Sequence, residues 1–308
     1  MANEIEQNLT HALLKEKRRD RLWRNLRTSV WILVVLLYAY LIFSLGSDKK
    51  TPDGPYVSLV RLNGAIMPGT AFSAEKVLPT LQKAFSDKPS KGVILLINSP
   101  GGSAVQASII HDRILALKKQ FHKKVVVVGE DALASGAYLI ATAADKIFVN
   151  PDTLTGSIGV IFSGFGFVDA MSKLGVTRRV YTAGGNKDRL DPFSPTNSQD
   201  IEKIKSLLDE VHQGFIQDVV ASRGNLLKSD DQKELFSGDF WSGNKAVKLG
   251  LADGTANLWV VIKKEFDAKY YKDFSPRPSL LTTLFSNVND ELHLGILQNK
   301  SPVQEKAY

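Results

Sequence analysis

Residues 125–150 read VVVVGEDALASGAYLIATAADKIFVN, and this stretch decides the fold. Its ends, VVVVG (125–129) and KIFVN (146–150), are short apolar runs of the kind that form strands buried on both faces of a sheet. Between them, SGAYLIATAA (135–144) has the composition of a helix built from small residues. A strand, a helix and a second strand in this order predict a parallel sheet with right-handed crossovers.

The same alternation continues on both sides of this stretch. Strand patterns recur before and after it, and helical patterns with one apolar side lie between most of them. This order of elements predicts an α/β protein with a largely parallel sheet. The expected strands are YVSLVRL (56–62), VILLIN (93–98) and RRVYTA (178–183), and the expected helices are 72–86, 103–120 and 197–223.

The composition is that of a globular protein. Of the 308 residues, 44% are apolar and 23% are charged, which is too apolar for a disordered chain and too charged for a multi-span membrane protein. Cysteine is absent, which excludes disulfides, cysteine nucleophiles, thiolate zinc sites and iron–sulfur clusters. The five histidines show no metal-ligand spacing such as HExxH, so we expect no bound metal.

Part of the net charge of +7 comes from the N-terminus. Residues 1–28 hold seven basic and four acidic side chains, which leaves +4 for the other 280 residues. The sequence contains no zinc-finger, RNP or basic-helix pattern, so we expect no nucleic-acid partner.

An uncharged segment of 20 residues (28–47) follows this basic N-terminus, with VWILVVLLYAYLIF (30–43) at its centre. As a helix it would span about 30 Å, the thickness of the hydrocarbon core of a bilayer. By the positive-inside rule, the basic residues hold the N-terminus in the cytoplasm and place the rest of the chain in the periplasm. We therefore predict a cytoplasmic N-terminus (1–28), a single transmembrane helix that anchors the chain in the inner membrane (29–46), and a linker (47–55).

A cleaved signal peptide is the alternative interpretation of this segment, because Ser44-Leu45-Gly46 offers small residues at suitable offsets for cleavage. The apolar run is longer than an ordinary signal-peptide core of about 7–15 residues, and the polar lead is also long. These lengths favour an uncleaved anchor.

Two short motifs lie at the carboxyl ends of predicted strands, where function is concentrated in parallel sheets. NSPGGS (98–103) directly follows VILLIN. Its paired glycines allow a sharp turn and a close approach to a ligand. Their N–H groups, at the start of the next helix, can point at a negatively charged oxygen. An ordinary strand-to-helix turn would have the same composition.

The second motif is ASGAY (134–138), in which Ser135 lies at the expected start of a helix. This position favours developing negative charge, although a simple N-cap serine would look the same. Ser135 follows Gly102 by 33 residues, the length of one strand-helix-strand crossover, so the two turns can be neighbours. A serine nucleophile would then be flanked by the N–H groups of Gly102 and Gly136, as in an oxyanion hole.

A serine nucleophile needs a base, and none of the five histidines stands in a triad-like motif. Lysine is the alternative, provided that burial lowers its pKa from near 10.4 to about 7. Lys187 lies in the Gly-rich loop TAGGNKDRLDPFSP (182–195), after a predicted strand. A solvated surface lysine would fit the same position.

NSPGGS, the block ASGAYLIATAADKIFVNPDTLTGSIGV (134–160) and AGGNKD (183–188) occur in this order and spacing. Together they resemble the signal peptide peptidase A family of membrane-bound Ser–Lys proteases, in its short, single-repeat form. The resemblance covers about residues 56–255. It implies the Clp-protease/crotonase-like superfold, a spiral of ββα units, in a protease domain (56–274). The remaining residues (275–308) would be a tail or an oligomer-contact arm.

The resemblance also implies roles for individual residues. Ser135 would be the nucleophile, Lys187 the general base, and the N–H groups of Gly102 and Gly136 the oxyanion hole. Ser157, in TGSIG, matches a serine that helps to hold the lysine amine. No metal, nucleotide or other cofactor is expected.

The expected function is that of a membrane-anchored serine endopeptidase that works through an acyl-enzyme. Its expected substrates are remnant signal peptides or other apolar, membrane-derived peptides. The family resemblance further implies a homo-oligomeric ring or dome, in which short members complete the Ser–Lys pair across a subunit contact. A crotonase-like acyl-CoA enzyme and a non-catalytic scaffold that binds membrane proteins are the alternatives.

Overall fold

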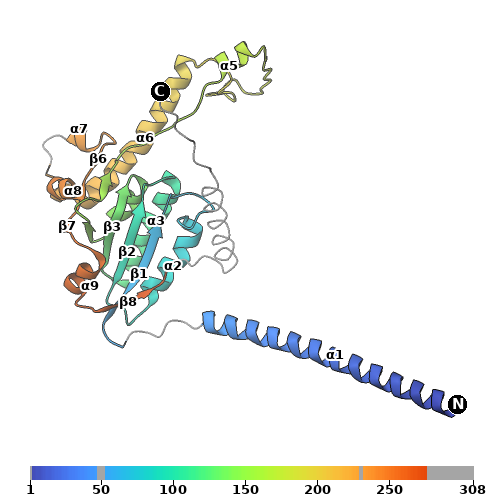
Figure 1. Ribbon diagram of the computed structural model, residues 1–308. Helices are drawn as coiled ribbons and strands as arrows, with labels where there is room; N and C mark the ends of the chain where they lie inside the picture. Colours follow the sequence, from blue (N-terminus) through green and yellow to red (C-terminus); the bar gives the residue numbers. More distant parts are fainter. Residues whose placement is uncertain (1, 47–52, 229–231, 276–308) are drawn as a thin grey trace, which may run out of the picture. The chain divides into compact units, whose positions relative to one another are not determined.

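The computed structural model describes the backbone of residues 2–46, 53–228 and 232–275 (Figure 1). Within the first helix it describes the side chains of residues 17–40 only. Two predicted segments lie mostly outside the described residues: the linker (47–55) and the tail (275–308).

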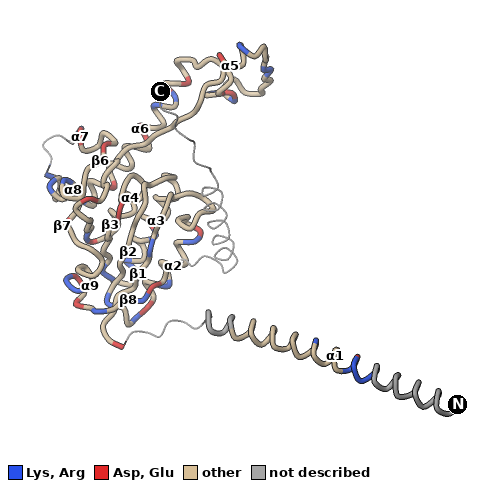
Figure 2. The backbone as a smooth tube through the Cα atoms, in the orientation of Figure 1, with Lys and Arg blue, Asp and Glu red and all other residues tan. Residues whose placement is uncertain are grey.

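The chain divides into two compact units, Met1–Thr51 and Pro52–Tyr308. The first contains one helix, α1 (Ala2–Gly46), whose described lysines and arginines gather in one short part of its length (Figure 2). Within the part of the chain that the structure describes, no helix has both the length and the hydropathy to cross a membrane. The predicted anchor (29–46) extends past this part, because the side chains of residues 41–46 are outside it.

A parallel sheet forms the centre of the second unit. Its middle strands are β1 (Tyr56–Asn63), β2 (Val93–Ser99) and β3 (Val125–Ala134), and β8 (Tyr270–Asp273) extends it beyond β1. Each neighbouring pair among these strands is parallel. The prediction of an α/β fold with a largely parallel sheet is therefore confirmed.

Strand β3 divides the sheet into two branches. The strands of these branches are β4 (Lys146–Val149), β5 (Leu154–Gly156), β6 (Phe240–Trp241) and β7 (Gly254–Thr255). Residues 126–129 pair with β4, which also pairs with β7, whereas residues 132–134 pair with β5. The other neighbour of β5, strand β6, is antiparallel. The predicted strand 125–129 thus continues to Ala134, directly before Ser135.

Packing on both faces of the sheet explains the continuous apolar runs of β2 and β3. Alternate residues such as Leu95 and Val127 belong to one core, and Leu96 and Val128 belong to the other. Helices α2 (Ala74–Ser86), α3 (Ala104–Phe121) and α4 (Gly136–Thr142) contribute to the first core, and so do later helical residues: Phe215, Val219, Leu235 and Ala246. Helix α9 (Leu258–Phe266) contributes to the second core.

A long excursion of the chain, which we call the arm (residues 161–197), interrupts the succession of strands. It contains α5 (Val168–Lys173) and leads into the long helix α6 (Ser198–Arg223). In Figure 1, α5 and the beginning of α6 project away from the strands. The smaller elements that follow are η1 (Gly224–Leu226), α7 (Gln232–Leu235) and α8 (Gly243–Leu249).

The predicted strand 178–183 is wrong. The other strands and helices predicted within residues 56–223 are confirmed with small shifts of their ends, except that the strand 125–129 extends to Ala134. No strand of the described residues pairs with this segment, and the side chains of Val180 and Tyr181 are exposed. The β-branched and aromatic residues suit a strand, but this preference reflects packing on a sheet, and here no sheet receives them.

Arg223 fastens the end of α6 to the body of the second unit. Its buried side chain donates from Nε and Nη2 to the Gly250 carbonyl, at 3.1 and 2.9 Å. Its Nη1 pairs with Asp253 Oδ2 at 2.8 Å, and the same oxygen accepts the Ile147 N–H at 2.7 Å. The cluster therefore joins α6 to β4.

We predict that Arg223→Met lowers the free energy of unfolding by about 3–5 kcal/mol, because the Asp253 carboxylate and the Gly250 carbonyl lose their donor. As a matched control, Lys205→Met on the exposed part of α6 should change it by less than about 0.5 kcal/mol. Urea denaturation of both variants measures these values. Wild-type stability of Arg223→Met would show that this cluster does not hold the helix.

Candidate active site

The turn after β2 leaves one backbone N–H unpaired. The Ile66 N–H donates to the Gly101 carbonyl at 2.9 Å, and the Ser103 N–H donates to the Ile66 carbonyl at 2.8 Å. This bridge between Ile66 and Gly102 does not use the Gly102 N–H, which has no partner among the described residues. Gly102 has φ 148°, and a Cβ there would lie 2.2 Å from the Ile66 carbonyl oxygen, so only glycine fits.

Ser135 occupies a sharp turn between β3 and α4. Its backbone has φ 53° and ψ −127°, a conformation that residues other than glycine rarely adopt. The Ser135 N–H donates to the Gly156 carbonyl at 2.8 Å, and the Ser135 carbonyl accepts the Leu139 N–H at 3.0 Å. The half-buried side chain makes no capping bond, and its hydroxyl has no hydrogen-bond partner among the described residues. The serine is therefore not acting as an ordinary N-cap.

The two turns lie side by side. A Cβ built on Gly101 would be 2.6 Å from Ser135 Cβ and 2.8 Å from the Gly136 nitrogen. A Cβ built on Gly136 would be 3.6 Å from the Gly102 nitrogen. The N–H groups of Gly102 and Gly136 thus lie close to each other and to the serine, as an oxyanion hole requires.

A cavity of about 700 Å³ opens beside this serine. None of the described residues that line it is charged. Its apolar lining comes from the segment after β1, from α3 and α4, from the chain after β5, and from α6: Met67, Val105, Leu139, Val160, Val211 and Phe215. Such a lining suits apolar side chains of a bound ligand.

Ser157 lies next to the turn that holds Ser135. It directly follows Gly156, whose carbonyl accepts the Ser135 N–H, and its own N–H donates to the Asp239 carbonyl at 2.7 Å. Ser157 has φ 52°, and its hydroxyl makes no hydrogen bond within the described part of the chain. The structure therefore brings Ser157 together with Ser135.

Lys187 is not brought to Ser135 within one chain. It lies in the arm, in a turn closed by its N–H and the Gly184 carbonyl at 3.2 Å, and its side chain is exposed. It does not line the cavity beside Ser135, and its amine has no hydrogen bond or ion pair to any described residue.

The arm nevertheless has an internal structure. Arg178 pairs with Asp191 at 2.7 Å and lies over the ring of Phe193, 4.8 Å from its centroid. Phe193 also stacks on Phe167, with 5.3 Å between the ring centroids. These contacts shape the segment that carries Lys187.

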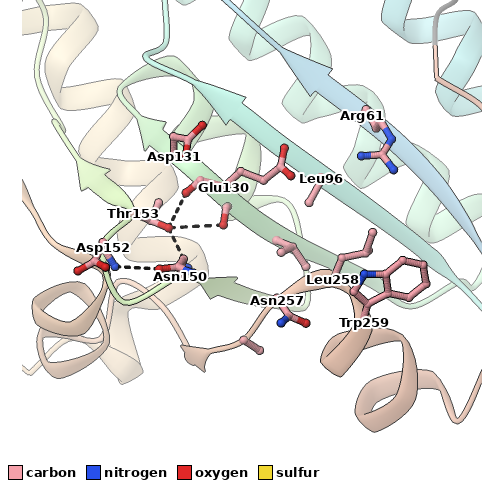
Figure 3. Close-up of a pocket in the computed structure, with 13 residues that line it drawn as sticks. Arg61, Leu96, Glu130, Asp131, Asn150, Asp152, Thr153, Asn257, Leu258 and Trp259 are labelled. Atoms are coloured by element: carbon pink, nitrogen blue, oxygen red, sulfur yellow. Dashed lines mark hydrogen bonds between the residues drawn. The ribbon is translucent and has the colours of Figure 1, made fainter.

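A second cavity, of about 520 Å³, lies on the face of the sheet that α9 covers (Figure 3). Its polar lining includes Arg61, Glu130 and Asp152, and the exposed Trp259 lies at one side. The Thr153 hydroxyl in its wall is already engaged, because it donates to the Glu130 carbonyl at 2.6 Å. Among the described residues, no group of acidic and histidine side chains could hold a metal ion. This cavity presents no free nucleophile.

His212 is a residue that sequence reasoning left without a role. Its Nε2 lies 3.0 Å from the Ile158 carbonyl oxygen, one residue beyond Ser157. The sequence gives no signal for this contact, because 54 residues separate the two partners.

Comparisons with known proteins agree with this fold. The model of peptidase family S49 matches residues 117–269, and the Clp protease model matches residues 60–155. Over 206 residues the chain is 31% identical to "Putative protease slr0021" of Synechocystis sp., which is 66% of this chain and 71% of that protein. These matches support a serine protease with a Clp-protease-like fold.

The chain belongs to peptidase family S49. It is 34% identical over 182 residues to "Putative signal peptide peptidase SppA" of Enterococcus faecium, which is 59% of this chain and 52% of that protein. It is also 44% identical over 231 residues to a Brucella melitensis protein named "Na(+)/H(+) antiporter NhaA", which is 73% of this chain and 31% of that protein. The chain thus spans less than two thirds of the length of both. The resemblance to the signal peptide peptidase A family is confirmed.

We predict that Gly101→Ala lowers kcat/KM for a cleavable peptide by about 100-fold or more, because the added methyl group would displace Ser135 and the Gly136 N–H. Gly214→Ala is the matched control, since a Cβ there meets open space, and it should leave activity unchanged. Steady-state kinetics of both variants tests this. Full activity of Gly101→Ala would contradict the described packing of the two turns.

Proposed function

We propose that the protein is a membrane-anchored serine endopeptidase with Ser135 as nucleophile and Lys187 as general base. The observation that carries the proposal is the strained turn that presents the unpaired hydroxyl of Ser135 to an apolar cavity, beside the N–H groups of Gly102 and Gly136. The crotonase-like and scaffold alternatives need no serine at this turn.

The proposed reaction begins when the neutral amine of Lys187 takes the hydroxyl proton as Ser135 Oγ attacks the peptide carbonyl carbon. The N–H groups of Gly102 and Gly136 stabilise the resulting oxyanion. The C–N bond then breaks, and the protonated lysine gives its proton to the leaving amine. Water, deprotonated by the same lysine, attacks the acyl carbon, and the lysine returns this proton to Ser135 Oγ as the ester bond breaks.

A neighbouring subunit supplies the lysine in this proposal. Lys187 is exposed on the arm of its own chain, and the arm also exposes large apolar side chains: Ile161 (85%), Phe165 (81%) and Tyr181 (91%). Exposure of this kind marks a surface that contacts another molecule. A homo-oligomeric ring or dome would bury these side chains and bring one chain's lysine to the next chain's serine. The uncharged cavity lining favours a neutral amine there.

The apolar lining also supports the proposed substrate class, remnant signal peptides and other apolar, membrane-derived peptides. Their side chains beside the scissile bond would fill the cavity formed by residues such as Leu139 and Phe215. Ser157 would orient the lysine amine through its free hydroxyl.

We predict that Ser135→Ala and Lys187→Ala each lower kcat by about 1,000-fold or more. Co-assembly of the two variants in equal amounts should restore roughly a quarter of the wild-type activity, because random neighbours then combine an intact serine with an intact lysine. Lys173→Ala, at another exposed lysine of the arm, is the matched control and should remain active. Two inactive variants that give no recovery together would contradict a dyad shared between subunits.

We propose that residues 29–46 anchor the chain in the inner membrane, with the N-terminus in the cytoplasm and the protease domain in the periplasm. The uncharged segment and the seven basic residues before it support this topology. We predict that the full chain stays in the membrane pellet after carbonate extraction, whereas a variant without residues 1–46 is released. A mature N-terminus near Ser47 would contradict the anchor and favour a cleaved signal peptide.

A further inference from the structure

One hydrogen bond joins the chain before the arm to the helix that follows it. The chain leaves the body after Ile158, whose side chain is fully buried, and it returns through α6. His212 of α6 places Nε2 3.0 Å from the Ile158 carbonyl oxygen. Because a carbonyl can only accept, the proton must be on Nε2, and the ring is the donor.

His212 lies where α6 meets the body. The buried side chains of α6 are Phe215, Val219 and Arg223, all of which follow His212 in the chain. The residues of α6 before it are largely exposed and continue into the arm. Among the described contacts of α6 with the body, the bond to Ile158 is therefore the one nearest the arm. The first turn of α6 also contacts the arm itself, because Asp200 pairs with Arg189 at 3.0 Å.

The segment at the other end of this bond is irregular. Ser157 has φ 52°, and the Gly159 N–H turns back to donate to the Ser157 carbonyl at 3.0 Å. Few other hydrogen bonds fix the direction in which the chain departs from this point. A donor from α6 can therefore set the angle between the root of the arm and the helix that brings it back.

We infer that His212 is a positioning residue. Its hydrogen bond to the Ile158 carbonyl, which we call the clasp, holds the chain at the start of the arm and so fixes where Lys187 is placed in the neighbouring subunit. This inference rests on the proposed function. A misplacement of the lysine amine by about 1 Å would slow proton transfer markedly without preventing substrate from binding.

A second role for His212 would act on the other subunit. Val211 and Phe215, its neighbours on α6, line the cavity beside Ser135 of the same chain. If removing the hydrogen bond of His212 disturbed the wall of this cavity, it would impair the chain that supplies the serine. If it displaced the arm instead, it would impair the chain that supplies the lysine. The two roles can therefore be separated in mixed oligomers.

The first test compares His212→Leu with His212→Gln in the full chain. Leucine removes the donor, and glutamine places an amide N–H at a similar distance from Cα. We expect His212→Leu to lower kcat by about 10- to 100-fold with KM changed less than about twofold, and His212→Gln to restore kcat. Gln213→Leu, at the exposed neighbouring position, should behave as wild type. A rise in KM alone, or a kcat that His212→Gln does not restore, would contradict the positioning role of His212.

The second test places His212→Leu on one partner of the co-assembled Ser135→Ala and Lys187→Ala chains. Activity should be lost when His212→Leu is on the Ser135→Ala chain, which supplies the lysine. It should be kept when His212→Leu is on the Lys187→Ala chain, which supplies the serine. The opposite pattern, or an equal loss in both, would contradict an action through the arm.

Hydrogen exchange separates this inference from the proposed function. In His212→Leu, but not in His212→Gln, amides of residues 158–160 and of the first half of α6 should exchange at least about tenfold faster. If the co-assembled chains carrying native His212 show no recovery, the shared dyad fails, and with it the role assigned to His212. Unchanged exchange in His212→Leu would overturn the clasp even if the dyad stands.

Discussion

The hydrogen bond from the Ser135 N–H to the Gly156 carbonyl, at 2.8 Å, holds the turn on which the site depends. The backbone of Ser135 is in a conformation that costs on the order of 1–3 kcal/mol and persists only where its surroundings enforce it. Two features of the surroundings enforce it. Gly101 has no side chain that would displace the turn, and the helix α4 that follows Ser135 is buried. In α4, the Tyr138 hydroxyl donates to the Leu251 carbonyl at 2.8 Å, and burial raises the pKa of Tyr138 above its usual value, so it remains a donor.

Strand β3 pairs with β4 in its first half and with β5 in its second half, and this arrangement places the turn at Ser135. Between its two paired parts, the Asn98 side chain accepts the Ala132 N–H at 3.1 Å and donates to Asp131 at 2.6 Å. Thr153 binds the Glu130 carbonyl from the other side. These side chains stabilise the irregular middle of β3, so that its last residues can pair with β5 and end beside Gly156.

Much of this arrangement could be predicted from local sequence. Buried apolar runs indicated β1, β2 and β4, and the spacing of Gly102 and Ser135 correctly suggested neighbouring turns. The second half of β3 was missed, because Glu130 and Asp131 end the apolar pattern while side chains elsewhere support the backbone. The false strand at 178–183 has strand-like residues but no partner. The contact of His212 depends on tertiary packing, and the proposed meeting of Lys187 with Ser135 depends on another chain, so neither has a local signal.

The site thus divides into a part formed by the sheet and α4 and an arm whose lysine, in the proposed mechanism, reaches the serine of a second subunit. In the proposed mechanism, the strained turn makes Ser135 the nucleophile. Peptide mapping by mass spectrometry, after treatment of the full-length protein with a fluorophosphonate, identifies the serine that reacts. We expect one adduct, on Ser135. An unlabelled protein, or an adduct on another serine such as Ser103 or Ser157, would contradict it.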